Sequence, residues 1–214
     1  MRRLLALVAL ASLLPGVPQA ADVIRLVPDK EAVAKDPVYV ALDRSYRVRY
    51  PELGGPVEVR ETMVNPAAGW AEFAAKETGA LYIVSVRLSP EAGEGRELDA
   101  VRQRYADFPK QAPRNFVDGF TRGPFGRTYT FTLLNADPVT GYPVKLALRP
   151  GNDIDTAAVH RFFVANGYQY ELAFVAQRRG AFAKDDPTAL VARANAVLDR
   201  TLAGFQPLRP SAKK

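Results

Sequence analysis

The sequence predicts an α+β fold, a mainly antiparallel β-sheet flanked by a central helix and a C-terminal helix. Three observations lead to this class. Segments in which apolar and polar residues alternate recur along most of the chain, as in half-buried strands. Glycine and proline turns separate these segments by short distances, which is typical of antiparallel neighbours. Apolar residues recur at spacings of three and four in two longer segments, one central and one C-terminal.

The first 21 residues have the layout of a secretory signal peptide. Arg2 and Arg3 precede an apolar run over residues 4–14, and small residues follow at Ala20 and Ala21. The run is about half of the ~20 residues that a membrane-spanning helix needs. We therefore expect cleavage after Ala20 or Ala21, the alternative being an uncleaved N-terminal anchor.

The rest of the chain is expected to form one domain over residues 22–207, followed by a disordered tail over residues 208–214. Residues 22–28 predict a short strand, and residues 29–37 a single helical turn. In the next strand, Tyr46, Val48 and Tyr50 alternate with arginines, so one face is expected to be buried.

Two further strands are predicted around Gly79, which marks a tight turn. The second of them, residues 81–88, is rich in β-branched and aromatic residues. In the first, Trp70 and Phe73 fall on opposite faces of an ideal strand, so a helix remains an alternative there.

The central helix is predicted from Leu98, Val101, Tyr105 and Phe108, which recur at helical spacing, and it is expected to stop at Pro109. Strands are predicted to follow over residues 116–135 and 142–151. The first of these carries an aromatic set that we interpret as core and not as the lining of a ligand groove: Phe116, Phe120, Phe125, Tyr129 and Phe131.

A β-hairpin is predicted around Asn166-Gly167, the strongest short signal for a type I′ turn. A two-residue loop sets the register, placing His160 opposite Ala173 with Glu171 diagonal to it at roughly 7 Å. Both faces of this hairpin carry bulky apolar side chains, which is typical of strands inside a sheet covered on both sides.

The C-terminal helix begins with Asp186 as its N-cap and Pro187 in its first turn. Its apolar stripe consists of Leu190, Val191, Ala194, Val197, Leu198, Leu202 and Phe205.

Three short motifs carry a resemblance to a known family. They are the strand ending "YRVRYP" with Gly69-Trp70 further on, the aromatic hairpin "RFFVANGYQYELAFVA", and the helix end "LAGFQP". With the order of elements, these motifs resemble the PsbP-like α/β/α sandwich family over roughly residues 38–207. The resemblance implies that fold and a bacterial exported protein. Members of the fold differ in activity, so no function follows from it.

Composition excludes several functions. The chain has no cysteine, and therefore no disulfide, thiolate nucleophile or cysteine metal ligand. Its net charge of +6 is modest, and removal of Arg2 and Arg3 with the signal lowers it to +4. Export also argues against a nucleic-acid partner. No Gly-rich phosphate-binding motif is present, so we expect no cofactor.

His160, the single histidine, and Glu171 are the candidate catalytic residues. A carboxylate can orient an imidazole that acts as a general base. A nucleophile is lacking, however, because no serine of the chain lies in a Gly-x-Ser-x-Gly elbow. A hairpin histidine bonded to Glu171 is the simpler interpretation.

Asp153 and Asp155 are the candidate metal ligands, since hard cations prefer clustered carboxylates. The segment lacks the number and spacing of carboxylates that a calcium loop needs, and we interpret it as a turn between strands.

We therefore expect a periplasmic or secreted, non-enzymatic binding or accessory protein of the cell envelope, with no membrane span after signal cleavage. Its partner is expected to be another envelope protein. One alternative is a small-molecule or lipid binder with an apolar pocket between sheet and helix. The other is an acid–base enzyme that uses His160 and Glu171, which requires both side chains to converge on an open cleft.

Overall fold

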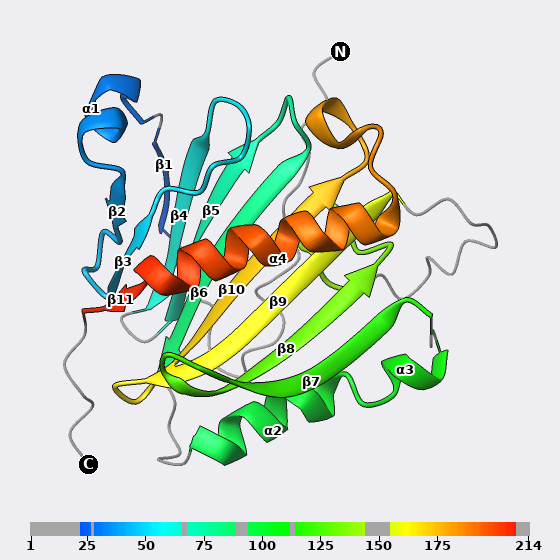
Figure 1. Cartoon of the computed structure of the whole chain (residues 1–214). Helices are drawn as coiled ribbons and strands as arrows, with labels where there is room; N and C mark the ends of the chain where they lie inside the picture. Colours follow the sequence, from blue (N-terminus) through cyan, green and yellow to red (C-terminus); the bar gives the residue numbers. More distant parts are fainter. Residues whose placement is uncertain are drawn as a thin grey trace.

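The computed structural model describes residues 22–26, 28–65, 68–88, 94–111, 114–143 and 155–208. It confirms a mixed α+β architecture built mostly from antiparallel sheet. Eight strands form one sheet in the order β1-β4-β5-β6-β10-β9-β8-β7, and three more form a small sheet in the order β11-β3-β2. Helices lie on both faces of the large sheet (Figure 1).

The strands are β1 (Asp22–Leu26), β2 (Val38–Val40), β3 (Tyr46–Arg49), β4 (Glu58–Asn65), β5 (Ala68–Ala75), β6 (Ala80–Leu88), β7 (Phe116–Gly123), β8 (Gly126–Leu134), β9 (Thr156–Ala165), β10 (Tyr168–Gln177) and β11 (Gln206–Pro207). The helices are α1 (Lys30–Lys35), α2 (Glu94–Arg104), α3 (Phe108–Gln111), the 3₁₀ turn η2 (Gly180–Phe182) and α4 (Pro187–Gly204).

The β9–β10 hairpin confirms the predicted register. Asn166 and Gly167 both have positive φ, at 54° and 79°, as a type I′ turn requires. His160 pairs with Ala173, and Glu171 lies diagonal to it. Both strands are internal to the large sheet, and hydrophobic clusters cover both of their faces.

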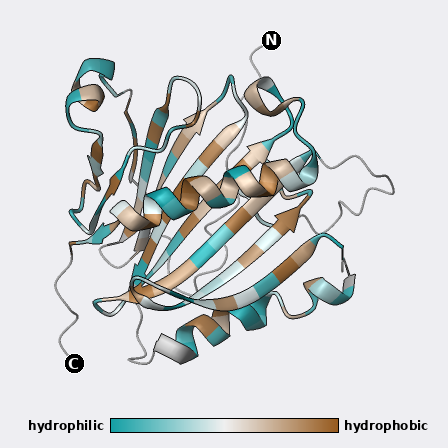
Figure 2. Ribbon diagram, viewed as in Figure 1, coloured by the Kyte–Doolittle hydropathy of each residue, from teal (hydrophilic) through white to brown (hydrophobic). Residues whose placement is uncertain are grey.

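The C-terminal helix α4 also begins where the sequence predicts. The Asp186 carboxylate accepts the N–H of Ala189 at 2.8 Å, which satisfies one of the free donors of the first turn. The helix crosses β9 and β10 (Figure 1) and shows apolar and polar residues on different sides (Figure 2). Its buried residues are Leu190, Ala194, Val197, Leu198, Thr201 and Leu202.

The central helix differs from its predicted end. Helix α2 ends at Arg104, because the N–H groups of Tyr105 and Ala106 bond to carbonyls three residues back and tighten the turn. Pro109 does not stop a helix but lies in α3, where a first-turn position needs no N–H. Leu98 and Val101 of α2 still cover β8 and β9 on the face opposite α4.

The segment before Gly79, for which the sequence allows a strand or a helix, is a strand. Trp70 and Phe73 lie in β5, which pairs with β6 across the turn at Gly79. Phe73 is fully buried on the α4 side, whereas Trp70 is half-buried on the other face. Pairing on both sides, with β4 and β6, determines the strand conformation here.

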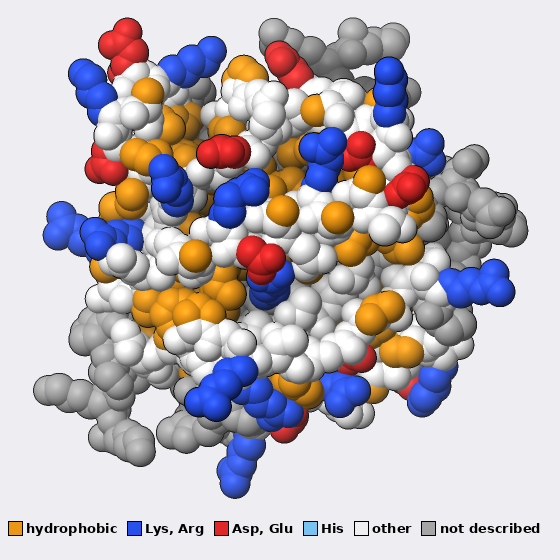
Figure 3. Space-filling view, viewed as in Figure 1, with side chains coloured by type: hydrophobic (Ala, Val, Ile, Leu, Met, Phe, Trp, Pro, Cys, Tyr) orange, Lys and Arg blue, Asp and Glu red, His pale blue; other side chains and the backbone are white. Residues whose placement is uncertain are grey.

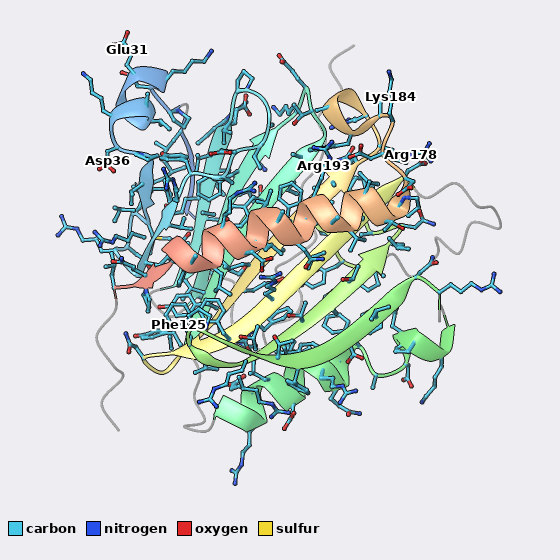
Figure 4. The ribbon with its side chains drawn as sticks, in the orientation of Figure 1. Glu31, Asp36, Phe125, Arg178, Lys184 and Arg193 are labelled. Carbon is cyan, nitrogen blue, oxygen red and sulfur yellow. The ribbon has the colours of Figure 1, made fainter. Side chains whose placement is uncertain are left out.

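The aromatic set around β7 and β8 is divided between the two faces. Phe116, Tyr129 and Phe131 are buried and Phe120 packs beside them on the α2 side. Phe125, at the tip of the hairpin, folds to the α4 side and stacks on Phe163 at 4.8 Å. Hydrophobic side chains reach the surface close to Phe125, beside the C-terminal end of α4 (Figures 3 and 4).

Some predictions concern residues outside those described. These are the signal peptide over residues 1–21, residues 144–151 of the strand predicted over residues 142–151, Asp153, and residues 209–214 of the tail. Leu208, the first residue of the predicted tail, is described, and its N–H donates to the carbonyl of Ser45.

Candidate functional site

His160 lies in the middle of β9 with no exposed surface. Its Nδ1 lies 2.7 Å from Glu171 Oε1, and its Nε2 lies 2.8 Å from the carbonyl oxygen of Gly141. A carbonyl only accepts, so Nε2 must carry a proton. The contact between Nδ1 and Glu171 Oε1 engages the other ring nitrogen.

Tyr142 completes this network. Its hydroxyl donates to the same Glu171 oxygen at 2.5 Å, and its ring lies 4.7 Å from that of His160. Burial and the nearby Glu171 carboxylate raise the pKa of Tyr142, so the phenol stays protonated as a donor. Phe131 also stacks on the imidazole, with the two ring centroids 4.4 Å apart.

The loop that brings Gly141 and Tyr142 to the sheet has its own bonds. The Asp137 carboxylate accepts the N–H groups of Val139 and Thr140, at 2.9 and 2.8 Å. Gly141 has φ +71°, and a Cβ there would lie 2.7 Å from Val175 Cγ2. Only glycine adopts this conformation in this space without strain.

The geometry brings the two candidate catalytic residues together but buries them. Both nitrogens of His160 are bonded within the protein, and its ring is enclosed by Phe131, Tyr142 and the sheet. The acid–base hypothesis required an open cleft. The pair instead fastens the loop over residues 137–143 to the sheet.

The metal candidates do not form a cluster among the residues described. Asp155 is exposed, and its backbone N–H donates to Asn135 Oδ1 at 3.2 Å, as in a turn. Asp153 lies outside the described ranges. Within those ranges, no group of three histidine, aspartate or glutamate side chains is placed to hold a metal ion.

The layer between the sheet and α4, where the alternative of a small-molecule or lipid binder places an apolar pocket, is filled in the described part of the chain. Phe73, Phe163 and Phe174 of the sheet and Leu190 and Leu198 of the helix are all at most 1% exposed. Two hollows lie elsewhere. One, of about 220 Å³, is lined by both charged and apolar residues near the ends of β4 and β5, among them Glu58, Lys76 and Leu81. Another, of about 360 Å³, lies beside the end of α2.

The small sheet presents a different kind of surface. We call its solvent side the outer face, and it consists of Val38, Val40, Leu42, Arg47, Arg49, Gln206 and Leu208. Val40 and Leu42 are each 46% exposed, although both are aliphatic. The alternate residues Tyr39 and Ala41 are buried, so β2 turns one set of side chains inward and one outward.

The backbone of β2 has a free edge. Pro37 O accepts from Tyr50 N–H, and Ala41 N–H donates to Tyr46 O. Hydrogen-bonded pairs alternate in an antiparallel ladder, so the N–H and C=O groups of Val38 and Val40 point away from β3. No described residue pairs with them there.

Glu61 closes one end of this edge, and sequence reasoning missed it. Both of its carboxylate oxygens lie 3.1 Å from the Leu42 N–H, and it also accepts from the Tyr39 hydroxyl. Glu61 falls between Val59 and Met63 on the apolar side of β4. The sequence does contain a signal for Glu61, because a charged residue stands there at a position where the strand alternation predicts an apolar one.

No protein-family model matches the chain, and the comparison with curated proteins found no match. Of the helices described, none has both the length and the apolar character needed to cross a bilayer.

Proposed function

We propose that the protein is a non-enzymatic binding or accessory protein of the bacterial cell envelope, and that it binds an extended segment of a protein partner along β2. The free edge of β2, with its outward Val38 and Val40, is the observation that carries this proposal. An extended peptide can add to such an edge as a further strand, with main-chain bonds for affinity and side-chain contacts for specificity.

The partner segment is expected to alternate apolar and acidic side chains. Its apolar residues would cover Val38 and Val40, which water now contacts. On β3, Arg49 and Arg47 are the cross-strand neighbours of these two valines. Arg49 makes no ion pair with a described residue, so an acidic side chain on the added strand would complement it.

Two further parts of the proposal concern compartment and family. Export rests on the signal-like N-terminal sequence, which leads into β1 at Asp22. Membership of the PsbP-like sandwich family is supported by the antiparallel sheet with α4 on one face and α2 on the other (Figure 1).

The test is a selection of displayed random decapeptides on the mature protein, followed by NMR of the complex. Selected peptides should share alternating apolar and acidic residues, and they should protect the amides of Val38 and Val40 from hydrogen exchange. The matched variant is Val40→Pro, which removes an outward N–H that β3 does not use, so the fold is retained.

Binding to Val40→Pro should fall roughly tenfold or more, because a main-chain bond and strand continuity are lost. Circular dichroism and the urea midpoint confirm that the variant is folded. The proposal fails if no peptide is enriched over an uncoated surface, or if enriched peptides bind the folded variant equally well.

A further inference from the structure

Strand β7 is the outermost strand at the opposite end of the large sheet from β1 (Figure 1). It is eight residues long and pairs with β8 without a register shift. Val117 on this strand is 69% exposed, the largest exposed fraction of the large hydrophobic side chains in the described part of the chain. A long open edge of this kind is available for pairing with another strand.

The backbone of β7 shows which of its groups face outward. Leu134 N–H donates to Asn115 O, so Asn115 and every second residue after it bond to β8. The N–H and C=O groups of Phe116, Asp118, Phe120 and Arg122 therefore face the open edge. No described residue accepts from or donates to them there.

One antiparallel pairing of this edge with itself gives partners to the outward backbone N–H and C=O groups and also brings opposite charges together. If two copies meet about a two-fold axis at Phe120, Phe120 pairs with Phe120 of the second copy and Asp118 pairs with Arg122. All of these residues have outward backbone groups, so the three pairs form about six hydrogen bonds. A shift by four residues in one direction would place Asp118 opposite Asp118, which like charges disfavour.

The side chains at these positions have the exposure and the hydrogen-bonding capacity that such a contact requires. Arg122 is exposed and forms no ion pair with a described residue. Asp118 uses Oδ2 for Arg102 and for the Tyr129 hydroxyl, at 2.8 and 3.1 Å, which leaves Oδ1 to accept from a further arginine. On the other face, a Cβ at Gly119 would meet nothing within 4 Å, so there is room for the second strand's side chains.

We propose that the mature protein forms a two-fold dimer by antiparallel pairing of β7 with β7 of a second copy, centred on Phe120. The pairing continues the large sheet across the axis. Because β2 lies at the other end of the molecule, the dimer presents two β2 edges far from each other. The inference rests on β7 alone and does not depend on the proposed function.

Sedimentation equilibrium of the mature protein across the micromolar range tests the dimer. The wild type should show a concentration-dependent shift from monomer to dimer mass. Arg122→Glu places a glutamate opposite Asp118 in both symmetric pairs, and the dimer dissociation constant should rise roughly tenfold or more. Arg200→Glu, an equal charge reversal on the exposed side of α4, should leave the constant unchanged.

The register is tested by disulfide formation, since the chain has no native cysteine. Residues of a hydrogen-bonded antiparallel pair have Cα atoms about 5.5 Å apart, which a disulfide can bridge. Phe120→Cys should therefore form a covalent dimer on mild oxidation. Val117→Cys, although more exposed, should not, because its two copies are several residues apart in this register.

A monomer mass for the wild type throughout the range would overturn the proposal. So would an unchanged dissociation constant in Arg122→Glu, or equal cross-linking at both cysteine positions, which indicates random collision. Thermal unfolding of each variant shows that it is folded before these results are compared.

Discussion

His160 and Glu61 are buried polar side chains on different faces of the large sheet, and each holds a peripheral segment against it. His160 and Glu171 bond to the loop carbonyl of Gly141 and to Tyr142. Glu61 bonds to Tyr39 and to the backbone of Leu42 at the end of β2. Removing one member of such a network leaves its partners buried without a bond, which costs more than the bond itself contributes.

The protonation of His160 can be measured directly, because its ring gives the only histidine signals of the chain. We expect a proton on Nε2 in the folded protein, since Gly141 O can only accept. A long-range ¹H–¹⁵N correlation spectrum of the imidazole measures this. An Nδ1–H tautomer with a bare Nε2 would contradict the geometry.

Glu61 leads to a prediction about pH. Burial raises the pKa of the Glu61 carboxyl, although the bonds from Tyr39 and Leu42 partly oppose the rise. An acid with a raised pKa in the folded state stabilises the fold fully below its unfolded pKa, and this contribution is lost as pH rises through the folded pKa. The free energy of unfolding of Glu61→Gln relative to wild type should therefore increase from about pH 4 towards neutrality.

Glu58→Gln is the control, because the pH dependence of its free energy of unfolding, relative to wild type, has the opposite sign. Hydrogen bonds from Lys76 and Arg25 lower the pKa of Glu58, so its contribution is lost as pH falls. Relative to wild type, this variant should lose stability as pH rises towards about 4, and the difference should then stay constant up to neutrality. Urea unfolding at several pH values measures both variants, and parallel curves for the two would refute the assignment.

At the scale of elements, the loop over residues 137–143 and the β9–β10 hairpin form one unit. The hairpin places His160 next to Glu171, and the loop covers them with the carbonyl of Gly141 and the ring of Tyr142. The two parts meet only because Gly141 has a left-handed conformation next to Val175.

Gly141→Ala should therefore lower the free energy of unfolding by about 2–4 kcal/mol, from backbone strain and the contact with Val175. Gly119→Ala is the matched control, since its Cβ meets nothing within 4 Å and its φ is not positive. Its effect should stay within about 0.5 kcal/mol. Equal urea midpoints for the two variants would show that the loop does not depend on Gly141.

For the whole molecule, the proposed export has a measurable product. Cleavage after Ala20 or Ala21 leaves β1 whole, from its pairing of Asp22 with Met63 onward. The intact mass of protein from the periplasmic fraction should correspond to an N-terminal Ala21 or Asp22. A mass that includes residues 1–21, found with the membrane fraction, would instead support the uncleaved anchor.

The parts of the fold that depend on local chemistry were predictable from the sequence. Asn166-Gly167 determines the hairpin register, and hence the contact between His160 and Glu171, because a two-residue turn allows one alignment of the strands. Asp186 and Pro187 determine the start of α4 in the same way. Alternation along β3 determined which of its faces is buried.

The tertiary structure alone decided what those residues do. Whether His160 is open or enclosed depends on the loop at Gly141, which is distant in sequence and covers the ring. The role of Glu61 depends on the small sheet that folds back over β4, and the free edges of β2 and β7 depend on strand order. Local patterns specify conformation and faces, whereas exposure and pairing depend on which distant segments meet, and that is settled only when the whole chain packs.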